Sequence, residues 1–235
     1  DLQAIYSSYN NNARKRYVDW NRENTKTDVE YMIRRWYYFT WLSGDHIVEQ
    51  AVHSIDKMLW AKNDEPPAYC IANGGRQNRG ETEGNIFDHF AVVYQWENES
   101  GGTRGYHFSR QQNGTVGGYE VEVYGTKGFS SAKNRHAIIG KDDAWRFRGD
   151  NNDMYQTEHD ELFASIREGK PFNDGETAAQ STMVGILGRM AAYTGQQITY
   201  EEALNSKQDL TPEHLDWKKP LAVPDVPVPG VTKFV

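Results

Sequence analysis

The sequence predicts an α+β domain, in which an open, mainly antiparallel sheet carries helices on one face. Between residues 86 and 148, short apolar runs with a period of two residues are separated by glycine-containing or acidic turns, a pattern typical of antiparallel strands. Apolar residues recur at helical spacing over residues 41–60, 155–168 and 177–194. The sequence indicates no second helical layer. Because one face of such a sheet would stay bare, we expect another subunit to cover it.

The predicted helix over residues 41–60 contains the first candidate for a functional site. Ser43 stands at the N-cap position, and Asp45 lies in the first turn, where a carboxylate interacts favourably with the helix dipole. The apolar stripe of this helix consists of Ile47, Val48, Ala51, Val52, Ile55, Met58 and Leu59. A neighbouring arc consists of Asp45, Glu49, His53 and Asp56, joined by the ring of Trp60. An ordinary surface helix would intersperse Lys and Arg among its acids, so this arc needs an explanation.

Local patterns predict the other elements. The predicted strands occupy residues 2–9, 86–96, 105–111, 119–124, 129–132 and 145–148. We expect residues 10–27 to form a long polar loop and residues 72–76 a glycine turn. Gly195 stands at the C-cap of the last predicted helix, whose small residues predict close packing. The domain is predicted to span residues 1–209, with the proline-rich residues 210–235 as an extended tail on its surface.

Composition argues against several classes of protein. The net charge of −7 argues against a surface for nucleic acid or for an anionic membrane. The single cysteine, Cys70, excludes an internal disulfide and a thiolate zinc cluster. Aromatic residues make up 13% of the chain, which is typical of proteins that contact sugar rings or other subunits. The chain begins at Asp1 and shows no signal peptide, so an exported and a cytoplasmic location both stay open.

Glu49 and His53 are the leading candidates for chemistry. They lie one helical turn apart and face the same way, as expected of a proton-transfer pair in which Glu49 orients the imidazole. The alternative is purely structural. In that interpretation Asp45 only caps the helix, Glu49 and Asp56 are solvated, and His53 is a satisfied, partly buried histidine.

A metal site on the same helix is a further hypothesis. His46, Glu49 and His53 are spaced by three and four residues, and His89 or Asp88 could complete the ligand shell. Zinc-binding helices place two histidines four residues apart around a glutamate, and this helix does not. We therefore predict that the protein holds no metal.

Several segments resemble the C-terminal domain of the Gfo/Idh/MocA oxidoreductases, the family of glucose-fructose oxidoreductase and inositol dehydrogenase. These segments are residues 36–56, 125–128, 158–159, 186–189 and 191–195. The resemblance covers nearly the whole chain and is strongest to the branch found in Bacteroidetes and Planctomycetes, whose members are often exported. It implies an open, mainly antiparallel sheet backed by helices, which follows a Rossmann domain and forms oligomers through its exposed face.

The resemblance also implies roles for individual residues. The family's acid, histidine and aspartate fall on Glu49, His53 and Asp56. His53 would then be the acid/base at a sugar hydroxyl or carbonyl, and Glu49, where the family more often has Asp, would orient it or hold the substrate. The further expected substrate contacts are Asp45, Asp56, Trp41, Arg76 and His159. The implied reaction is hydride transfer between NAD or NADP and a carbinol carbon of a sugar or glycoside.

The nucleotide-binding half of that family does not occur in this sequence. No Gly-x-Gly-x-x-Gly motif follows a predicted strand, and the Glu-Lys-Pro segment with the catalytic lysine is absent. We therefore expect these residues to work with a Rossmann domain of the same protein, and to transfer no hydride by themselves. Two other functions stay open: an NAD-dependent glycoside hydrolase of the same family, and a noncatalytic carbohydrate-binding or assembly domain.

Overall fold

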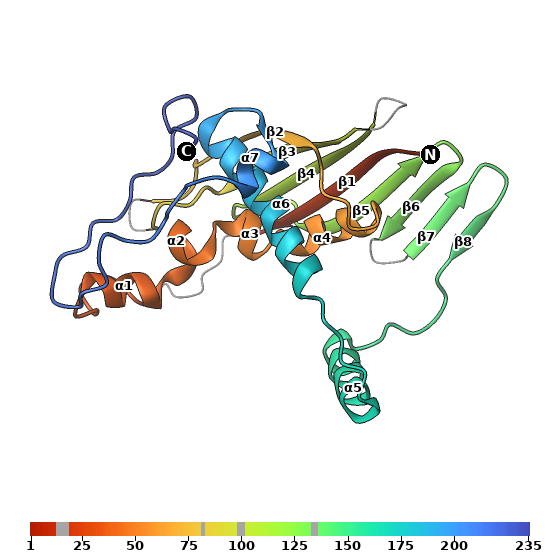
Figure 1. Cartoon of the computed structure of the whole chain (residues 1–235), viewed down its shortest axis with the longest axis horizontal. Helices are drawn as coiled ribbons and strands as arrows, with labels where there is room; N and C mark the ends of the chain where they lie inside the picture. The colour runs from red at the N-terminus through yellow and green to blue at the C-terminus, as the bar shows by residue number, and fades with distance from the viewer. Residues whose placement is uncertain (13–18, 81–82, 98–101, 133–135) are drawn as a thin grey trace.

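A nine-stranded sheet organises the molecule, which is described here from a computed structural model (Figure 1). The structure describes residues 1–12, 19–80, 83–97, 102–132 and 136–235. The strands are β1 (Leu2–Asn11), β2 (Tyr69–Gly75), β3 (His89–Trp96), β4 (Thr103–Gln111), β5 (Gly118–Gly125), β6 (Gly128–Ala132), β7 (His136–Gly140), β8 (Ala144–Arg146) and β9 (Ile198–Thr199). The helices are α1 (Asp28–Arg34), the 3-10 turn η1 (Trp36–Tyr38), α2 (Thr40–Ser43), α3 (His46–Glu49), α4 (Val52–Trp60), α5 (Met154–Glu168), α6 (Gly175–Thr194) and α7 (Tyr200–Leu204).

The sheet is mixed but mainly antiparallel. Its strand order is β8-β7-β6-β5-β1-β4-β3-β2-β9. β1 is parallel to β4 and antiparallel to β5, and the other pairings among the described strands are antiparallel. The predicted α+β class with an open, mainly antiparallel sheet is therefore confirmed. The strands over residues 86–148 do not form an uninterrupted meander, however, because β1 lies between β4 and β5.

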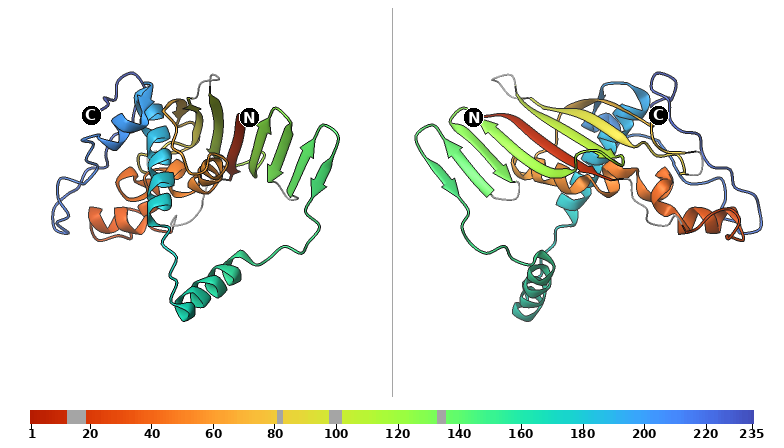
Figure 2. Two further views of the ribbon diagram at one scale, coloured as in Figure 1. Left: turned by 45° about the vertical axis from the view of Figure 1, so that its right-hand side comes forward. Right: turned by 180° about the vertical axis from the view of Figure 1, so that it is seen from behind.

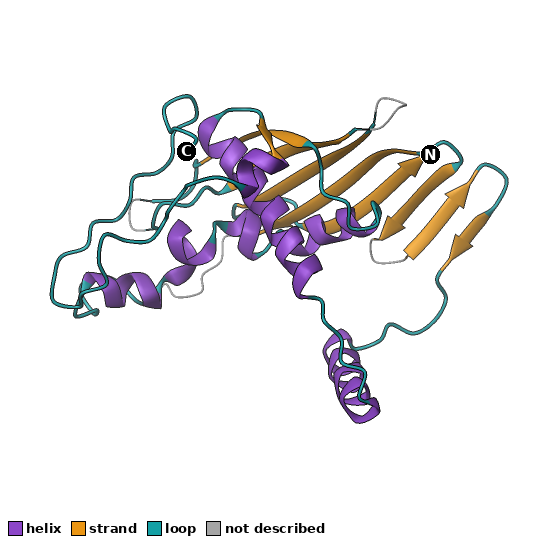
Figure 3. Cartoon of the chain, in the orientation of Figure 1, coloured by secondary structure: helices purple, strands orange, loops and turns teal. Residues whose placement is uncertain are grey.

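The helices that pack on the sheet cover one of its faces (Figure 3). α6 packs against β2 and β3, and α4 packs against β1 and β5. Seen from behind, the sheet shows its opposite face with no described helix across it (Figure 2). No helix among the described residues is long and apolar enough to cross a membrane.

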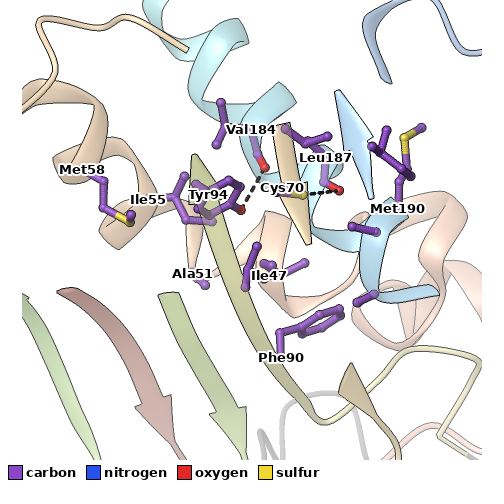
Figure 4. Packing of buried hydrophobic residues seen from close by; sticks show 14 of the residues in the cluster. Ile47, Ala51, Ile55, Met58, Cys70, Phe90, Tyr94, Val184, Leu187 and Met190 are labelled. Carbon is purple, nitrogen blue, oxygen red and sulfur yellow. Dashed lines mark hydrogen bonds between the residues drawn. The ribbon is translucent and has the colours of Figure 1, made fainter. Parts of the chain in front are cut away.

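The larger core cluster lies between the sheet and helices α3, α4 and α6 (Figure 4). Two hydrogen bonds fix α6 to the strands beneath it. The hydroxyl of Tyr94 donates to the carbonyl of Val184 at 3.0 Å, and the thiol of Cys70 donates to the carbonyl of Leu187 at 3.5 Å. A Cβ atom added to Gly188 would lie 2.5 Å from the Tyr94 hydroxyl, so a small residue is required at this approach. The close packing predicted from the small residues of α6 is confirmed.

The prediction of a single helix over residues 41–60 is wrong. The chain forms α2, α3 and α4 instead, and Gly44 and Asp45 interrupt it with φ angles of 72° and 74°. Ser43 is not the N-cap of the following helix. Asp45 caps α3, because its side chain accepts from the backbone N–H of His46, while the Ser43 hydroxyl accepts from the N–H of Asp45 at 3.1 Å. A positive φ is unfavourable for a residue with a Cβ, so other contacts of Asp45 must offset it.

The other differences concern strand ends and short strands. The glycine turn predicted at residues 72–76 is instead the end of β2, whose Gly74 and Gly75 pair with Phe90 and His89. β1 continues to Asn11, so the predicted loop over residues 10–27 starts later, and its residues 13–18 lie outside the described part of the chain. β7 and β9 were not predicted. The C-cap prediction is confirmed, because Gly195 ends α6 with a φ of 71°.

A second, smaller core cluster lies beside α1 and α2. It is built from Val29, Tyr31, Met32, Tyr37, Tyr38, Phe39, Ile86 and Leu221. The aromatic residues before α3 are therefore packed rather than solvated. Residues 210–235 contain no helix or strand, and Leu221 joins this part of the chain to the cluster.

Candidate functional site

The two leading candidates, Glu49 and His53, lie where α3 gives way to α4. Glu49 is the last residue of α3, and His53 is the second residue of α4. His53 is exposed, whereas Glu49 is half-buried and its Oε2 atom is buried without a hydrogen-bond partner among the described residues. A buried carboxylate oxygen without a donor is unfavourable. The position is therefore suited to a ligand or a further domain that supplies one.

An aromatic wall borders this pair. The ring of Tyr9 on β1 lies 6.3 Å from the ring of His53 and 4.5 Å from the ring of Tyr119 on β5, measured between centroids. The Tyr9 hydroxyl donates to Oε1 of Gln50 at 3.3 Å. Asn11 lies two residues beyond Tyr9 on the same face of β1, and both polar atoms of its side chain are buried and unpaired. Aromatic rings beside unpaired polar groups suit a ligand with an apolar face and several hydroxyls.

Asp45 is an internal anchor, which corrects its assignment as a substrate contact. Its carboxylate is fully buried and accepts from the backbone N–H of His46 at 2.5 Å, the N–H of Phe87 at 2.7 Å and the hydroxyl of Tyr193 at 2.5 Å. Burial alone would raise the pKa of Asp45. The hydrogen bonds and the charge of His46, with the donors Tyr193 and Phe87, outweigh burial and hold that pKa below its ordinary value.

His46 extends the Asp45 network to β4. Its Nδ1 lies 3.1 Å from the Asp45 carboxylate and 3.2 Å from the carbonyl of Phe87, which accepts its hydrogen, and its Nε2 lies 3.2 Å from the Ser109 hydroxyl. The order Asp–His–Ser is that of a catalytic triad. Each of these three residues is at most 1% exposed, so no substrate can reach the serine. Because both ring nitrogens are occupied, His46 is also not a metal ligand.

Asp56 and Arg76 make hydrogen bonds within the chain. Asp56 lies one turn beyond His53, but its Oδ1 accepts from the Ser181 hydroxyl at 2.6 Å and thereby fixes α4 to α6. The guanidinium of Arg76 donates to the carbonyls of Gly80 and Gly84 and closes the loop that follows β2. Both side chains therefore hold protein segments together.

Trp41 and His159 lie away from the Glu49–His53 pair. Trp41 packs against the smaller core cluster and lines a cavity of about 310 Å³, whose other walls include Met32 of α1 and Leu210 of the tail. His159 is exposed on α5, where its Nδ1 donates to the carbonyl of Tyr155 at 2.7 Å. α5 stands apart from α4 in both Figure 1 and Figure 2. Of the predicted residues, Glu49, His53 and Asp56 lie on the consecutive helices α3 and α4, whereas Trp41 lies in α2, Arg76 follows β2 and His159 lies on α5.

A second charged pair consists of Asp88 and His89, which the sequence indicated only as further ligands of the hypothetical metal ion. Asp88 is fully buried and accepts from the N–H groups of Gln77 at 2.7 Å and Asn78 at 2.6 Å, from the amide of Gln112 at 3.0 Å and from Nδ1 of His89 at 2.8 Å. Burial alone would raise the pKa of Asp88, but these hydrogen bonds hold it below its ordinary value. This loop anchor could not be recognised from spacing alone.

The geometry also decides the metal hypothesis for these residues. Phe90 points into the core beneath the helices, so its strand neighbour His89 points to the opposite face of the sheet. His89 therefore cannot complete a shell around Glu49 and His53. Within the described residues, no group of three or more His, Cys, Asp or Glu side chains is arranged to hold a metal ion.

The fold is similar to that of several solved structures. It matches an aldose-aldose oxidoreductase from Caulobacter crescentus with a TM-score of 0.63 and 13% identity, over 84% of this chain and 55% of that one. It matches a UDP-N-acetylglucosamine 3-dehydrogenase from Acidithiobacillus ferrooxidans with a TM-score of 0.60 and 13% identity, over 81% and 53%. A protein of gentamicin A biosynthesis, solved in complex with NAD, matches with a TM-score of 0.59 and 12% identity, over 84% and 55%. Neither a protein-family model nor a curated protein sequence matches the sequence.

These matches confirm the fold that the resemblance implied. The chain has the architecture of about half of an oxidoreductase of this type, consistent with the C-terminal domain, and no Rossmann domain is evident in the described residues. It spans between 53% and 58% of the length of the matched chains. At identities this low the matches establish the fold and leave the residues of the site to be argued from their own geometry.

Proposed function

We propose that this chain is the substrate-binding part of an NAD(P)-dependent oxidoreductase, which transfers hydride between a nicotinamide and a hydroxyl-bearing carbon of a sugar or glycoside. The main support is the exposed imidazole of His53 beside the ring of Tyr9, which contacts Tyr119, together with Glu49, four residues earlier in the chain, whose Oε2 has no partner among the described residues. The fold shared with an aldose-aldose oxidoreductase and a UDP-N-acetylglucosamine dehydrogenase gives independent support.

In this proposal His53 handles the proton of the reacting hydroxyl. In the oxidising direction the imidazole accepts the hydroxyl proton while the C–H hydrogen leaves as hydride, so that the carbinol becomes a carbonyl. Glu49 orients the imidazole or accepts a second hydroxyl of the sugar with its free Oε2. The Tyr9 and Tyr119 rings lie against the apolar face of the sugar ring. In the reducing direction His53 returns the proton.

The described residues do not fit a dinucleotide by themselves. A dinucleotide-binding site of the Rossmann type needs a parallel βαβ unit with a glycine-rich turn. Among the described strands the parallel pairing is that of β1 with β4, and no Gly-x-Gly-x-x-Gly motif follows either strand. We therefore assign NAD or NADP to a Rossmann domain of the same protein, which packs against this one. When bound, the nicotinamide supplies or accepts the hydride.

Replacing His53 with Asn in the protein as its gene encodes it should lower the turnover of the preferred sugar by at least about 100-fold, the usual contribution of a general acid or base. Sugar binding should change little, because Asn keeps a polar group of similar reach. The measurement is the appearance of reduced nicotinamide over a panel of aldoses with NAD and NADP. Lys57→Gln is the matched control, since Lys57 is exposed on the same helix and makes no proposed contact.

The same assay separates the competing functions. Glycoside cleavage without net reduced nicotinamide would favour the glycoside hydrolase, in which oxidation is transient. Sugar binding without any turnover, unchanged by His53→Asn, would favour a noncatalytic carbohydrate-binding domain. Full activity of the His53→Asn variant would remove His53 from the mechanism.

We also propose that a second copy of the chain covers the open face of the sheet. Four large apolar side chains on this face are between 37% and 48% exposed, namely Ile71, Phe108, Tyr124 and Phe129. They alternate with core-facing residues along β2, β4, β5 and β6, so they lie on the side that carries no helix. Exposed apolar side chains on an uncovered sheet face are typical of a subunit interface.

Phe108→Glu tests this dimer directly. A carboxylate at the centre of the face would be buried against its symmetry mate, so the dissociation constant should rise by at least about 30-fold. Sedimentation velocity at several concentrations measures it. Val116→Glu is the control, because Val116 is 84% exposed in the turn between β4 and β5. A monomeric unsubstituted protein would contradict the proposal.

A further inference from the structure

Helix α5 is well formed but stands alone. Asp153 caps its start by accepting from the N–H groups of Tyr155 and Gln156, and Gly169 ends it with a φ of 67°. Figures 1 and 2 show it set apart from the sheet and from the other helices, joined to them by extended segments. The helix therefore has local start and stop signals, but no surface in the described part of the chain is packed along its length.

One side of α5 is apolar and uncovered. Tyr155, Leu162, Phe163 and Ile166 follow one another at helical spacing, and they are 67%, 46%, 49% and 59% exposed. An isolated helix of 15 residues is marginal in water and gains most of its stability from packing an amphipathic face. Covering four side chains of this size would stabilise the helix. A partner surface is therefore needed for α5.

A second uncovered apolar area lies on the outer strands. Ile138 of β7 and Trp145 of β8 are paired across the two strands and are 56% and 53% exposed. Their side of the sheet is the helix-covered one, because Ile138 pairs with Ser130 and Ser130 pairs with the core residue Val123. α4 reaches across to β5, so β6 to β8 extend beyond it. We call Ile138 and Trp145 the outer-strand patch.

The candidate site lies on the same side of the sheet as the outer-strand patch. His53 is in the first turn of α4, its neighbour Tyr9 is on β1, and Tyr119, which contacts Tyr9, is on β5, the strand that pairs with β6. α5 lies beyond α4 on the helix-bearing side (Figures 1 and 2). A single folded body placed over α4 on this side would therefore extend toward both the outer-strand patch and α5.

We infer that α5 and the outer-strand patch form the docking surface for the dinucleotide-binding domain, an inference that rests on the function proposed above. That function requires the nicotinamide to reach a carbon held at His53, so the domain that binds it must sit over α4. The matched oxidoreductases are long enough to contain such a body, because a little under half of each lies outside the match. An anionic membrane is disfavoured, because the other side of α5 is acidic, with Asp160, Glu161 and Glu168.

Hydrogen exchange along α5 tests the inference. In the 235-residue chain alone, α5 amides should exchange nearly as fast as an unstructured peptide. In the full polypeptide that includes the dinucleotide-binding domain, they should exchange at least about 100-fold more slowly. The double variant Leu162→Gln with Ile166→Gln should lose this protection, whereas Asp160→Asn with Glu161→Gln, on the opposite side, should keep it.

The outcomes separate this inference from the proposed function. Fast exchange of α5 in an enzyme that still needs His53 would overturn the docking surface and leave the function standing. Protection of α5 together with full activity of His53→Asn would keep the docking surface and overturn the role of His53. Protection in the 235-residue chain that rises with its concentration would identify a second copy as the occupant, and protection by anionic vesicles would identify a membrane; either would overturn the inference.

Discussion

Replacing Asp45 with Ala should lower the free energy of unfolding by about 4 kcal/mol. The substitution removes one acceptor and leaves three donors buried without a partner, namely the N–H groups of His46 and Phe87 and the hydroxyl of Tyr193. It also removes the N-cap of α3 and leaves a positive φ that the lost contacts had offset. Urea unfolding followed by circular dichroism gives the value.

Two matched variants show whether the loss comes from this network. Tyr193→Phe removes a single donor and should cost about 1 kcal/mol. Asp56→Ala removes one hydrogen bond, to Ser181, from a half-buried carboxylate and should cost a similar amount. A loss for Asp45→Ala no larger than that of Asp56→Ala would show that Asp45 is not the anchor described here.

The Asp45 anchor also explains why the sequence predicted the wrong helix. The apolar stripe runs from Ile47 to Leu59 with an unbroken helical period, and it begins only after Gly44 and Asp45. Periodicity alone therefore cannot reveal a break at these two residues. The break is fixed by Phe87 and Tyr193, which are far away in the chain and donate to Asp45. A helical projection places Asp45 beside Glu49 but says nothing about what covers it.

The sheet shows the same division between local and distant information. α5 and the strands β4 to β6 could be predicted, because their periodicity and their glycine turns are local. The insertion of β1 between β4 and β5 could not, because it depends on pairings such as Ser7 with His107 across the chain. β9 has two residues, Ile198 and Thr199, too few for a pattern to indicate.

The candidate site was predictable in its centre but not in its surroundings. Glu49 and His53 lie four residues apart, so the pair could be chosen from sequence, although the two residues belong to α3 and α4. Tyr9 and Tyr119 could not be chosen, because Tyr9 reaches His53 from β1 and Tyr119 contacts Tyr9 from β5. Trp41 and His159 were chosen for residue type rather than for position, and they lie elsewhere.

His107 should make the protein less stable as the pH falls from about 6 to about 4. It is fully buried on β4, where its Nδ1 lies 2.8 Å from the Ser7 hydroxyl and its Nε2 has no partner. Burial, with a smaller contribution from the charge of His46, lowers the pKa of His107 to about 3. In the unfolded chain a histidine titrates near pH 6.5, as in model peptides.

The direction of this pH dependence of stability follows from proton binding. Between about pH 6.5 and pH 3 the unfolded chain holds a proton on His107 that the folded chain does not, so stability rises with pH and is lost as the pH falls. The slope from one such group is about 1.4 kcal/mol per pH unit, or about 2.7 kcal/mol between pH 6 and pH 4. Asp45 and Asp88 change the stability at lower pH values. Because the pKa of each carboxyl is lowered in the folded protein, their stabilisation is present above about pH 4 and is lost below it.

His107→Gln separates these contributions. The glutamine amide can still donate to Ser7 but does not titrate, so the slope between pH 6 and pH 4 should fall by about one proton, while the steep loss below pH 4 remains. The measurement is a set of urea unfolding curves at half-unit pH steps. His159→Gln is the control, because it removes a histidine that is exposed on α5 and not buried. An unchanged slope in His107→Gln would mean that the buried imidazole takes up its proton in the folded protein, and that the Ser7–His107 contact opens to water.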